Sequence, residues 1–142
     1  MLVRRACGAH LPHSPYPPLF LGHGLSYTTF EYSDISVDAT SSAPSILISF
    51  SVTNSGGVYG KEIAQLYISF PAAAGEPPFQ LRDFTSLPLA PGETTQVHFS
   101  LNERAYSIWD ESAYAWATVP GAYKVSVGAS SRDLRLSGSF SI

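Results

Sequence analysis

The stretch that decides the fold is residues 46–53, Ile-Leu-Ile-Ser-Phe-Ser-Val-Thr. Apolar side chains stand at every second position from Ile46 to Val52, and Ser or Thr fills most of the alternating positions. Because successive side chains of a strand point to opposite faces, this period of two predicts a β-strand with one buried face. Residues 54–57, Asn-Ser-Gly-Gly, follow at once, and residues of these types tolerate the positive φ angles of a turn.

Similar patterns recur along the chain, with turn signals roughly every 8–12 residues. Pro91-Gly92 and Pro120-Gly121 are two of these turn signals, and residues 102–112 hold at most one helical turn, with Asn102 as its cap. Further strands are expected around residues 30–37 (with a bulge near Ser33-Asp34), 64–69, 81–89, 95–101, 123–127 and 134–142. About seven short strands without alternating helices predict an all-β fold, an immunoglobulin/fibronectin type III-like antiparallel β-sandwich.

Residues 1–18 differ in composition from the rest of the chain and end in Ser-Pro-Tyr-Pro-Pro. Proline fixes its own φ and restricts the residue before it, so we expect an unstructured, Pro-rich leader here and the sandwich domain over residues 19–142. Residues 1–13 are too polar for the apolar segment of a signal peptide. No export signal is therefore identified, and the localisation stays open.

The charge and the apolar pattern exclude two classes of function. The 142 residues include 8 Lys and Arg and 11 Asp and Glu, a formal net charge of −3, and the only basic pair is Arg4-Arg5. A nucleic-acid partner needs phosphate-neutralising cations, and a membrane span needs about 20 consecutive apolar residues; the chain has neither. Cys7 is the only cysteine, so no internal disulfide can form.

Eight motifs follow one another along the chain: Phe20–Phe30, Val52–Gly56, Glu62–Ile68, Leu81–Phe84, Leu89–Glu93, Trp109-Asp110, Gly121–Tyr123 and Val127–Asp133. In this order and spacing they resemble the C-terminal fibronectin type III-like domain of glycoside hydrolase family 3 β-glucosidases, over about residues 19–142. Within the resemblance, residues 52–56 correspond to the first hairpin of the domain. One departure is Leu21, where the family usually has Pro.

The resemblance implies that catalysis belongs to other domains. In that family a barrel domain supplies an Asp nucleophile and an α/β domain usually supplies a Glu acid/base, and no residue here matches the nucleophile's motif. Glycoside hydrolysis needs two carboxyl groups flanking the bond, ~5–5.5 Å apart in retaining enzymes. The resemblance thus implies a non-catalytic accessory domain without a cofactor, packed against β-glucosidase catalytic domains absent from this chain, and extracellular if the parent enzyme is secreted.

Two groups of residues are candidate contact sites. The resemblance implies that one segment joins the sandwich to the catalytic body, its glycines permitting close backbone approach; a purely internal turn is the alternative. That segment consists of Gly22, His23, Gly24, Leu25, Ser26 and Tyr27. The second group is Trp109, Tyr114 and Trp116. Aromatic rings dominate sandwich cores, so we favour core or inter-domain packing for these three and keep stacking on sugar rings as the alternative.

Three other groups contain residue types used in catalysis or metal binding, and each has a simpler explanation. Asp110 and Glu111 are neighbours, which point apart in a strand, and so indicate a solvated turn. Residues 130–133, Ser-Ser-Arg-Asp, lack a Gly-x-Ser-x-Gly elbow and predict a polar turn in which Arg132 and Asp133 pair. The four histidines show no ligand spacing, so we expect no metal site.

Three functions are compatible with the sequence: an accessory domain of a glycosidase, a free-standing carbohydrate-binding or adhesive module, and a non-functional fragment. An accessory domain should expose an apolar patch that includes Leu25 or Tyr27. A binding module should expose Trp109, Tyr114 or Trp116 with coplanar rings. A fragment should be marginally stable and should aggregate.

Overall fold

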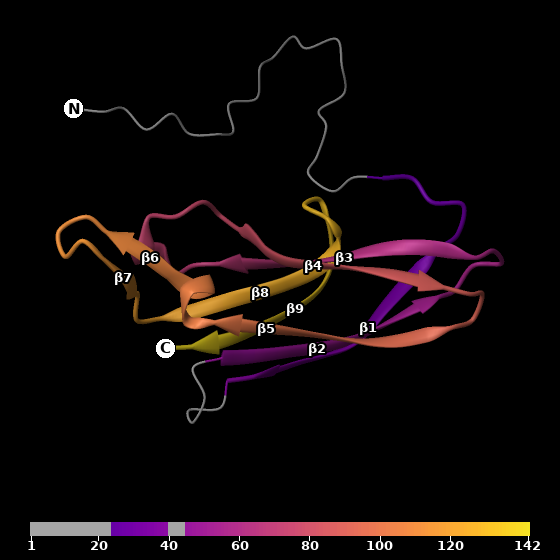
Figure 1. The fold of residues 1–142 in the computed structure, drawn as a ribbon, viewed down its shortest axis with the longest axis horizontal. Helices are drawn as coiled ribbons and strands as arrows, with labels where there is room; N and C mark the ends of the chain where they lie inside the picture. The colour runs from indigo at the N-terminus through magenta and orange to yellow at the C-terminus, as the bar shows by residue number, and fades with distance from the viewer. Residues whose placement is uncertain (1–23, 40–44) are drawn as a thin grey trace, which may run out of the picture.

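The computed structural model describes residues 24–39 and 45–142, which form nine strands and two short 3-10 helices (Figure 1). The strands are β1 (Phe30–Asp38), β2 (Ser45–Asn54), β3 (Gly60–Ser69), β4 (Gln80–Leu89), β5 (Thr94–Asn102), β6 (Ser107–Asp110), β7 (Ala115–Thr118), β8 (Ala122–Ser130) and β9 (Asp133–Ser141). The helices are η1 (Ala72–Ala74) and η2 (Glu103–Tyr106). Neither helix is long or apolar enough to span a bilayer. The leader expected over residues 1–18 lies outside the described residues.

Seven of these strands build two antiparallel sheets, one of order β1-β2-β5 and one of order β4-β3-β8-β9. Strands β6 and β7 pair only with each other and form a separate hairpin at one end of the molecule (Figure 1). The all-β, antiparallel sandwich expected from the alternating pattern is confirmed. The hairpin is an addition to its seven strands.

The core lies between the inner faces of the two sheets. Strand β2 buries Ile46, Ile48, Phe50 and Val52, the alternating face that the sequence indicates. Because full burial of such a side chain stabilises a fold by roughly 1.5–3 kcal/mol, this period-two pattern selects the register of the strand. The other sheet and β5 contribute Ala64, Leu66, Ile68, Leu87, Leu89, Val97, Phe99, Leu101, Tyr123, Val125, Val127 and Phe140.

Two local expectations are confirmed in detail. The register of β1 against β2 shifts between Ser33 and Ser36, and Asp34 has φ 58°, so the bulge lies where it was expected. Asn102 caps η2, because its side-chain oxygen accepts a hydrogen bond from the Ala105 N–H at 3.1 Å.

The expected hairpin at residues 52–56 is wrong. Strand β2 pairs with β1 and β5, whereas β3 belongs to the other sheet, so the chain crosses between sheets here. Gly56 does not adopt a positive φ angle, so backbone conformation is not the reason for a glycine at this position. It is required for space: a Cβ on Gly56 would lie 2.1 Å from the Thr28 hydroxyl, and one on Gly60 would lie 2.5 Å from the Thr28 methyl group.

Candidate functional site

The segment before β1 is clamped to the sandwich by the side chain of Asn54, which is completely buried at the end of β2. Its oxygen accepts hydrogen bonds from the Thr28 hydroxyl at 2.7 Å and the Gly56 N–H at 3.1 Å. Its NH₂ group donates to the carbonyls of Val58 at 2.9 Å and Leu89 at 3.0 Å. All four hydrogen-bonding positions of this amide are used, so Asn54 joins three separate segments rigidly.

The clamp is extended by Ser55, whose N–H donates to the Thr29 carbonyl at 2.9 Å, while the two hydroxyl groups lie 3.2 Å apart. Immediately before this fixed point, the side chain of Leu25 is 97% exposed and that of Tyr27 is fully exposed. Sequence reasoning did not single out the clamp, although an asparagine at the end of an apolar strand is a signal for a buried polar group.

Two more exposed apolar side chains lie beside this segment. Gly60 packs against Thr28, and just before it Val58 is half-exposed and Tyr59 is 65% exposed. We call Leu25, Tyr27, Val58 and Tyr59 the apolar end. Within the expected docking segment, Gly22 and His23 lie outside the described residues. Gly24 and Ser26 are exposed and, with Leu25, line a hollow of about 110 Å³ against the start of β3.

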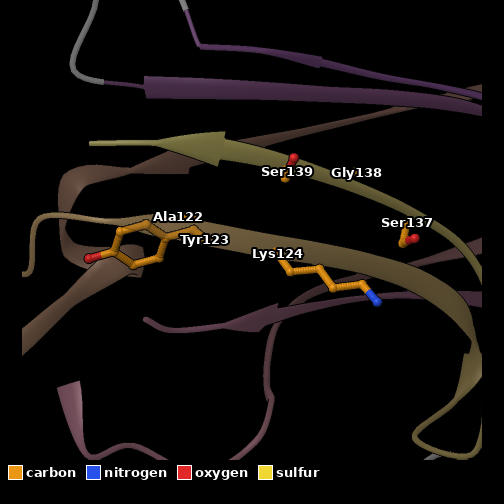
Figure 2. Close-up of a pocket in the computed structure, with 6 residues that line it drawn as sticks. All are labelled: Ala122, Tyr123, Lys124, Ser137, Gly138 and Ser139. Atoms are coloured by element: carbon orange, nitrogen blue, oxygen red, sulfur yellow. The ribbon is translucent and has the colours of Figure 1, made fainter. Parts of the chain in front are cut away.

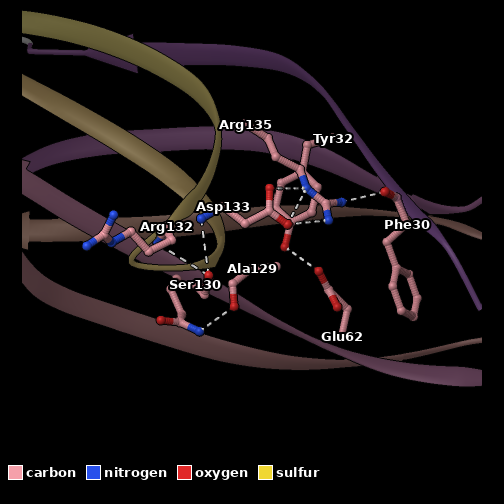
Figure 3. Close-up of polar contacts among 9 residues, drawn as sticks. Phe30, Tyr32, Glu62, Ala129, Ser130, Arg132, Asp133 and Arg135 are labelled. Atoms are coloured by element: carbon pink, nitrogen blue, oxygen red, sulfur yellow. Dashed lines mark hydrogen bonds and ion pairs between the residues drawn. The ribbon is translucent and has the colours of Figure 1, made fainter. Parts of the chain in front are cut away.

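A polar network ties β1 to β3 and β9 of the opposite sheet (Figure 3). The buried carboxylate of Glu62 in β3 accepts a hydrogen bond from the Tyr32 hydroxyl in β1 at 2.8 Å. In β9 the Arg135 guanidinium pairs with Asp133 at 2.7 Å, donates to the Phe30 carbonyl, and lies over the Tyr32 ring at 4.9 Å.

The electrostatics of this network indicate a structural lock. Burial, and then the Glu62 carboxylate, raise the pKa of Tyr32 far above its ordinary value, so its hydroxyl stays a donor. The hydrogen bonds from Arg135 hold the pKa of Asp133 below its ordinary value. Each carboxylate of this network is therefore engaged by a protein group.

Glu62 shares the alternating buried face of β3 with Ala64 and Leu66. A charged residue on an otherwise apolar strand face is the sequence signal that could have revealed this buried carboxylate.

The hollow at β8 and β9 offers no acid/base pair either (Figure 2). Its volume is about 330 Å³, and Lys124 is its one charged residue. The hydroxyl of Tyr123 is already used: it donates to the Val119 carbonyl at 2.7 Å and accepts from the Val119 N–H at 3.1 Å. This bond from a tyrosine near a strand start to the backbone upstream is the tyrosine corner of immunoglobulin-like sandwiches. The remaining lining residues are Ala122, Ser137, Gly138 and Ser139.

The polar turns at Asp110 and Ser130 have the roles that the sequence indicates. The Asp110 carboxylate accepts hydrogen bonds from the N–H groups of Ser112 at 2.8 Å and Ala113 at 3.2 Å, and so caps the hairpin turn. Ser130 caps the turn before β9 in the same way. Asp133 forms an ion pair with Arg135 at 2.7 Å, and the expected pairing of Arg132 with Asp133 stays a prediction. Among residues 24–39 and 45–142, no cluster of three metal-ligating side chains occurs.

The three aromatic residues of the β6–β7 hairpin lie outside the sandwich core, so of the two expected arrangements, core packing is wrong and inter-domain packing stays a prediction. Trp109 is 47% exposed, Trp116 is 45% exposed and Tyr114 is 82% exposed, because neither main sheet covers the hairpin. Trp109 and Trp116 are cross-strand partners whose rings lie 5.6 Å apart at 60°, so they are not coplanar. The Arg104 guanidinium lies 3.5 Å from the centre of the Trp116 ring, a contact that sequence reasoning missed.

Comparison with known proteins matches residues 62–131 to the fibronectin type III-like domain. Probable β-glucosidase L of Aspergillus terreus is 46% identical over 144 residues, which cover 89% of this chain and 20% of the relative. Probable β-glucosidase D of Aspergillus niger is 40% identical over 148 residues, covering 92% of this chain and 20% of the relative. The chain thus spans about a fifth of the length of these relatives.

Solved structures agree with these sequence matches. The β-glucosidase D2-BGL of Chaetomella raphigera superposes with a TM-score of 0.79 at 41% identity, covering 85% of this chain and 20% of that one. The GH3 β-glucosidase of Bifidobacterium adolescentis gives a TM-score of 0.81 at 34% identity, with coverages of 85% and 18%. The chain therefore belongs to the fibronectin type III-like domain family, in the form found within β-glucosidases of glycoside hydrolase family 3.

Proposed function

We propose that this chain is a non-catalytic accessory domain of a β-glucosidase-type glycoside hydrolase, and that its apolar end docks onto the catalytic domains. The observation that carries the proposal is the exposure of Leu25 and Tyr27 directly before the clamped residues Thr28 and Thr29. About four fifths of each β-glucosidase relative lies outside the matched region, and that part is the natural partner for this surface.

The physical argument rests on preorganisation. Large apolar side chains held in water are unfavourable, and gathering them on one surface marks an interaction site. Burying Leu25 or Tyr27 in an interface recovers roughly 1.5–3 kcal/mol for each. Because the Asn54 clamp already fixes the backbone beside them, less conformational entropy is lost on docking than for a flexible arm.

The distribution of carboxylates supports an accessory role. A glycosidase needs two carboxyl groups flanking one bond. The Glu62 carboxylate is hydrogen-bonded to Tyr32, and Asp133 is paired with Arg135. The hollow beside the apolar end is lined by one carboxylate, that of Glu62, and the hollow at β8 and β9 is lined by none. Cleavage of β-glucosides would therefore belong to the partner domains.

The test uses the purified 142-residue chain and the A. terreus β-glucosidase expressed without its matched segment. We expect the chain to form a complex with that body on size-exclusion chromatography and to raise its thermal stability. Leu25→Ser and Tyr27→Ser should each weaken the complex at least tenfold, since the loss of about 1.4 kcal/mol is tenfold in affinity. Tyr114→Ser is the matched control, because this residue is also strongly exposed but lies in the turn of the β6–β7 hairpin.

Two results would contradict the proposal. One is turnover of a chromogenic β-glucoside by the chain alone, above a mock preparation. The other is complex formation that the Tyr114→Ser control weakens as much as Leu25→Ser does. A chain that aggregates and shows no cooperative unfolding would instead favour the fragment hypothesis.

A further inference from the structure

The β6–β7 hairpin is a second exposed aromatic surface, separate from the apolar end. It lies at the opposite end of the sandwich from the segment that precedes β1 (Figure 1). At its tip Tyr114 adopts φ 50°, the left-handed conformation that hairpin turns use.

Charged groups of both signs accompany the hairpin aromatics. Glu103, Arg104, Ser107 and Trp116 line a hollow of about 260 Å³, close to the lower limit of ~300–1,000 Å³ for small-ligand pockets. Trp109 does not line this hollow, but its ring contacts that of Trp116 at a centroid distance of 5.6 Å and an angle of 60°. The stacking of Arg104 at 3.5 Å holds the guanidinium against the indole ring.

These groups match the chemistry of a sugar ring. A pyranose has apolar C–H faces that pack on aromatic rings, and hydroxyl groups that both donate and accept hydrogen bonds. The indole rings of Trp109 and Trp116 supply the apolar contact, the Glu103 carboxylate accepts, and the Arg104 guanidinium donates. Trp and Arg are also common in the cores of protein–protein interfaces, whereas Glu is depleted there, so the Glu103 carboxylate beside the hollow is the group that favours a saccharide over a protein partner.

The ring geometry narrows the ligand further. Binding to the flat surface of a crystalline polysaccharide needs coplanar rings, whereas these two rings meet at 60° and form a corner. A corner accommodates one or two sugar units at the end of a soluble chain. We propose that Glu103, Arg104, Trp109 and Trp116 form a binding site for the end of a soluble, neutral β-linked glucose oligomer. The choice of β-linked glucose rests on the proposed function. The choice of a saccharide as the class of ligand rests on the residues of η2 and the hairpin.

The experiment is a ¹H–¹⁵N NMR titration of the 142-residue chain with cellotetraose, up to about 10 mM, which detects dissociation constants near the millimolar range. We expect the indole N–H signals and the backbone signals of residues 103–117 to shift in a saturable way. Trp116→Ala should lower the affinity at least tenfold, and Arg104→Lys, which keeps the charge but loses the planar donor, should lower it severalfold.

Tyr59→Ala at the apolar end is the matched control and should leave the affinity unchanged. Because the hairpin lies outside the two main sheets, the variants should keep the β-sheet signals of the parent chain, which the same spectra check. The loss of complex formation with the catalytic body would contradict the proposed function but leave this titration unaffected.

Three outcomes would overturn the saccharide site: no saturable shift at about 10 mM cellotetraose, equal loss of affinity in Tyr59→Ala, or retention on crystalline cellulose that Trp116→Ala does not abolish. If the indole signals of Trp109 and Trp116 respond to the catalytic body and not to cellotetraose, the hairpin is a protein interface and the proposal is wrong.

Discussion

Asn54→Ala tests the clamp that orders the apolar end, and its cost follows from the four side-chain hydrogen bonds. The bond to the Leu89 carbonyl is buried, and the other three, to Thr28, Gly56 and Val58, are partly buried. An orphaned buried group costs about 1–3 kcal/mol, and each further lost bond about 0.5–1.5 kcal/mol. The sum is roughly 2.5–7.5 kcal/mol, a large part of the ~5–15 kcal/mol that stabilises a typical domain.

The assay is urea unfolding followed by tryptophan fluorescence, with thermal unfolding as a second measurement. At about 4 °C per kcal/mol for a domain of this size, the melting temperature should fall by more than about 10 °C. Asn102→Ala is the control, because the two are the only asparagines of the chain and Asn102 makes one exposed bond, to Ala105. If Asn54→Ala costs no more than Asn102→Ala, about 0.5–1 kcal/mol, the clamp is not a stabilising element.

Two further predictions concern the tyrosine corner and the lock at β9. Tyr123→Phe removes both hydrogen bonds to Val119 and should cost about 1–2 kcal/mol in urea unfolding, whereas the exposed Tyr59→Phe should cost nothing measurable. Because Arg135 holds the folded-state pKa of Asp133 below the unfolded value of 3.8, the stability from this pair is complete above about pH 4 and is lost as the pH falls through the lower pKa. Asp133→Asn should therefore flatten the decline of the melting temperature between about pH 4 and pH 2; an unchanged decline would contradict this assignment.

Strand existence and the core face of each strand could be predicted from local pattern. Residues 46–53 specify their own buried face, because the period of two is a property of the extended backbone itself and the apolar gain per side chain is large. The bulge at Ser33-Asp34 and the cap at Asn102 were predictable for the same reason: each depends on residues within a few positions of one another.

The candidate sites were only partly predictable. Leu25 and Tyr27 were named from a motif, and their exposure agrees with a docking role, but nothing local indicates that Asn54 fixes the segment beside them. Core or inter-domain packing was expected for Trp109 and Trp116 because aromatic residues usually dominate such contacts. Which side chains of this hairpin are covered is decided by the tertiary packing, which places β6 and β7 outside both main sheets and leaves their indole rings about half exposed.

The sequence by itself determined the alternation, the turns and hence the two-layer all-β class, since these follow from backbone geometry and side-chain polarity. Only the tertiary structure decided that residues 54–59 cross between sheets, that Tyr32 meets Glu62 across 30 positions, and that Arg104 stacks on Trp116. The Tyr32–Glu62 bond joins the two main sheets and exists only once they have packed, and the Arg104–Trp116 contact needs the β6–β7 hairpin to fold back beside η2. No local pattern of residues carries that information.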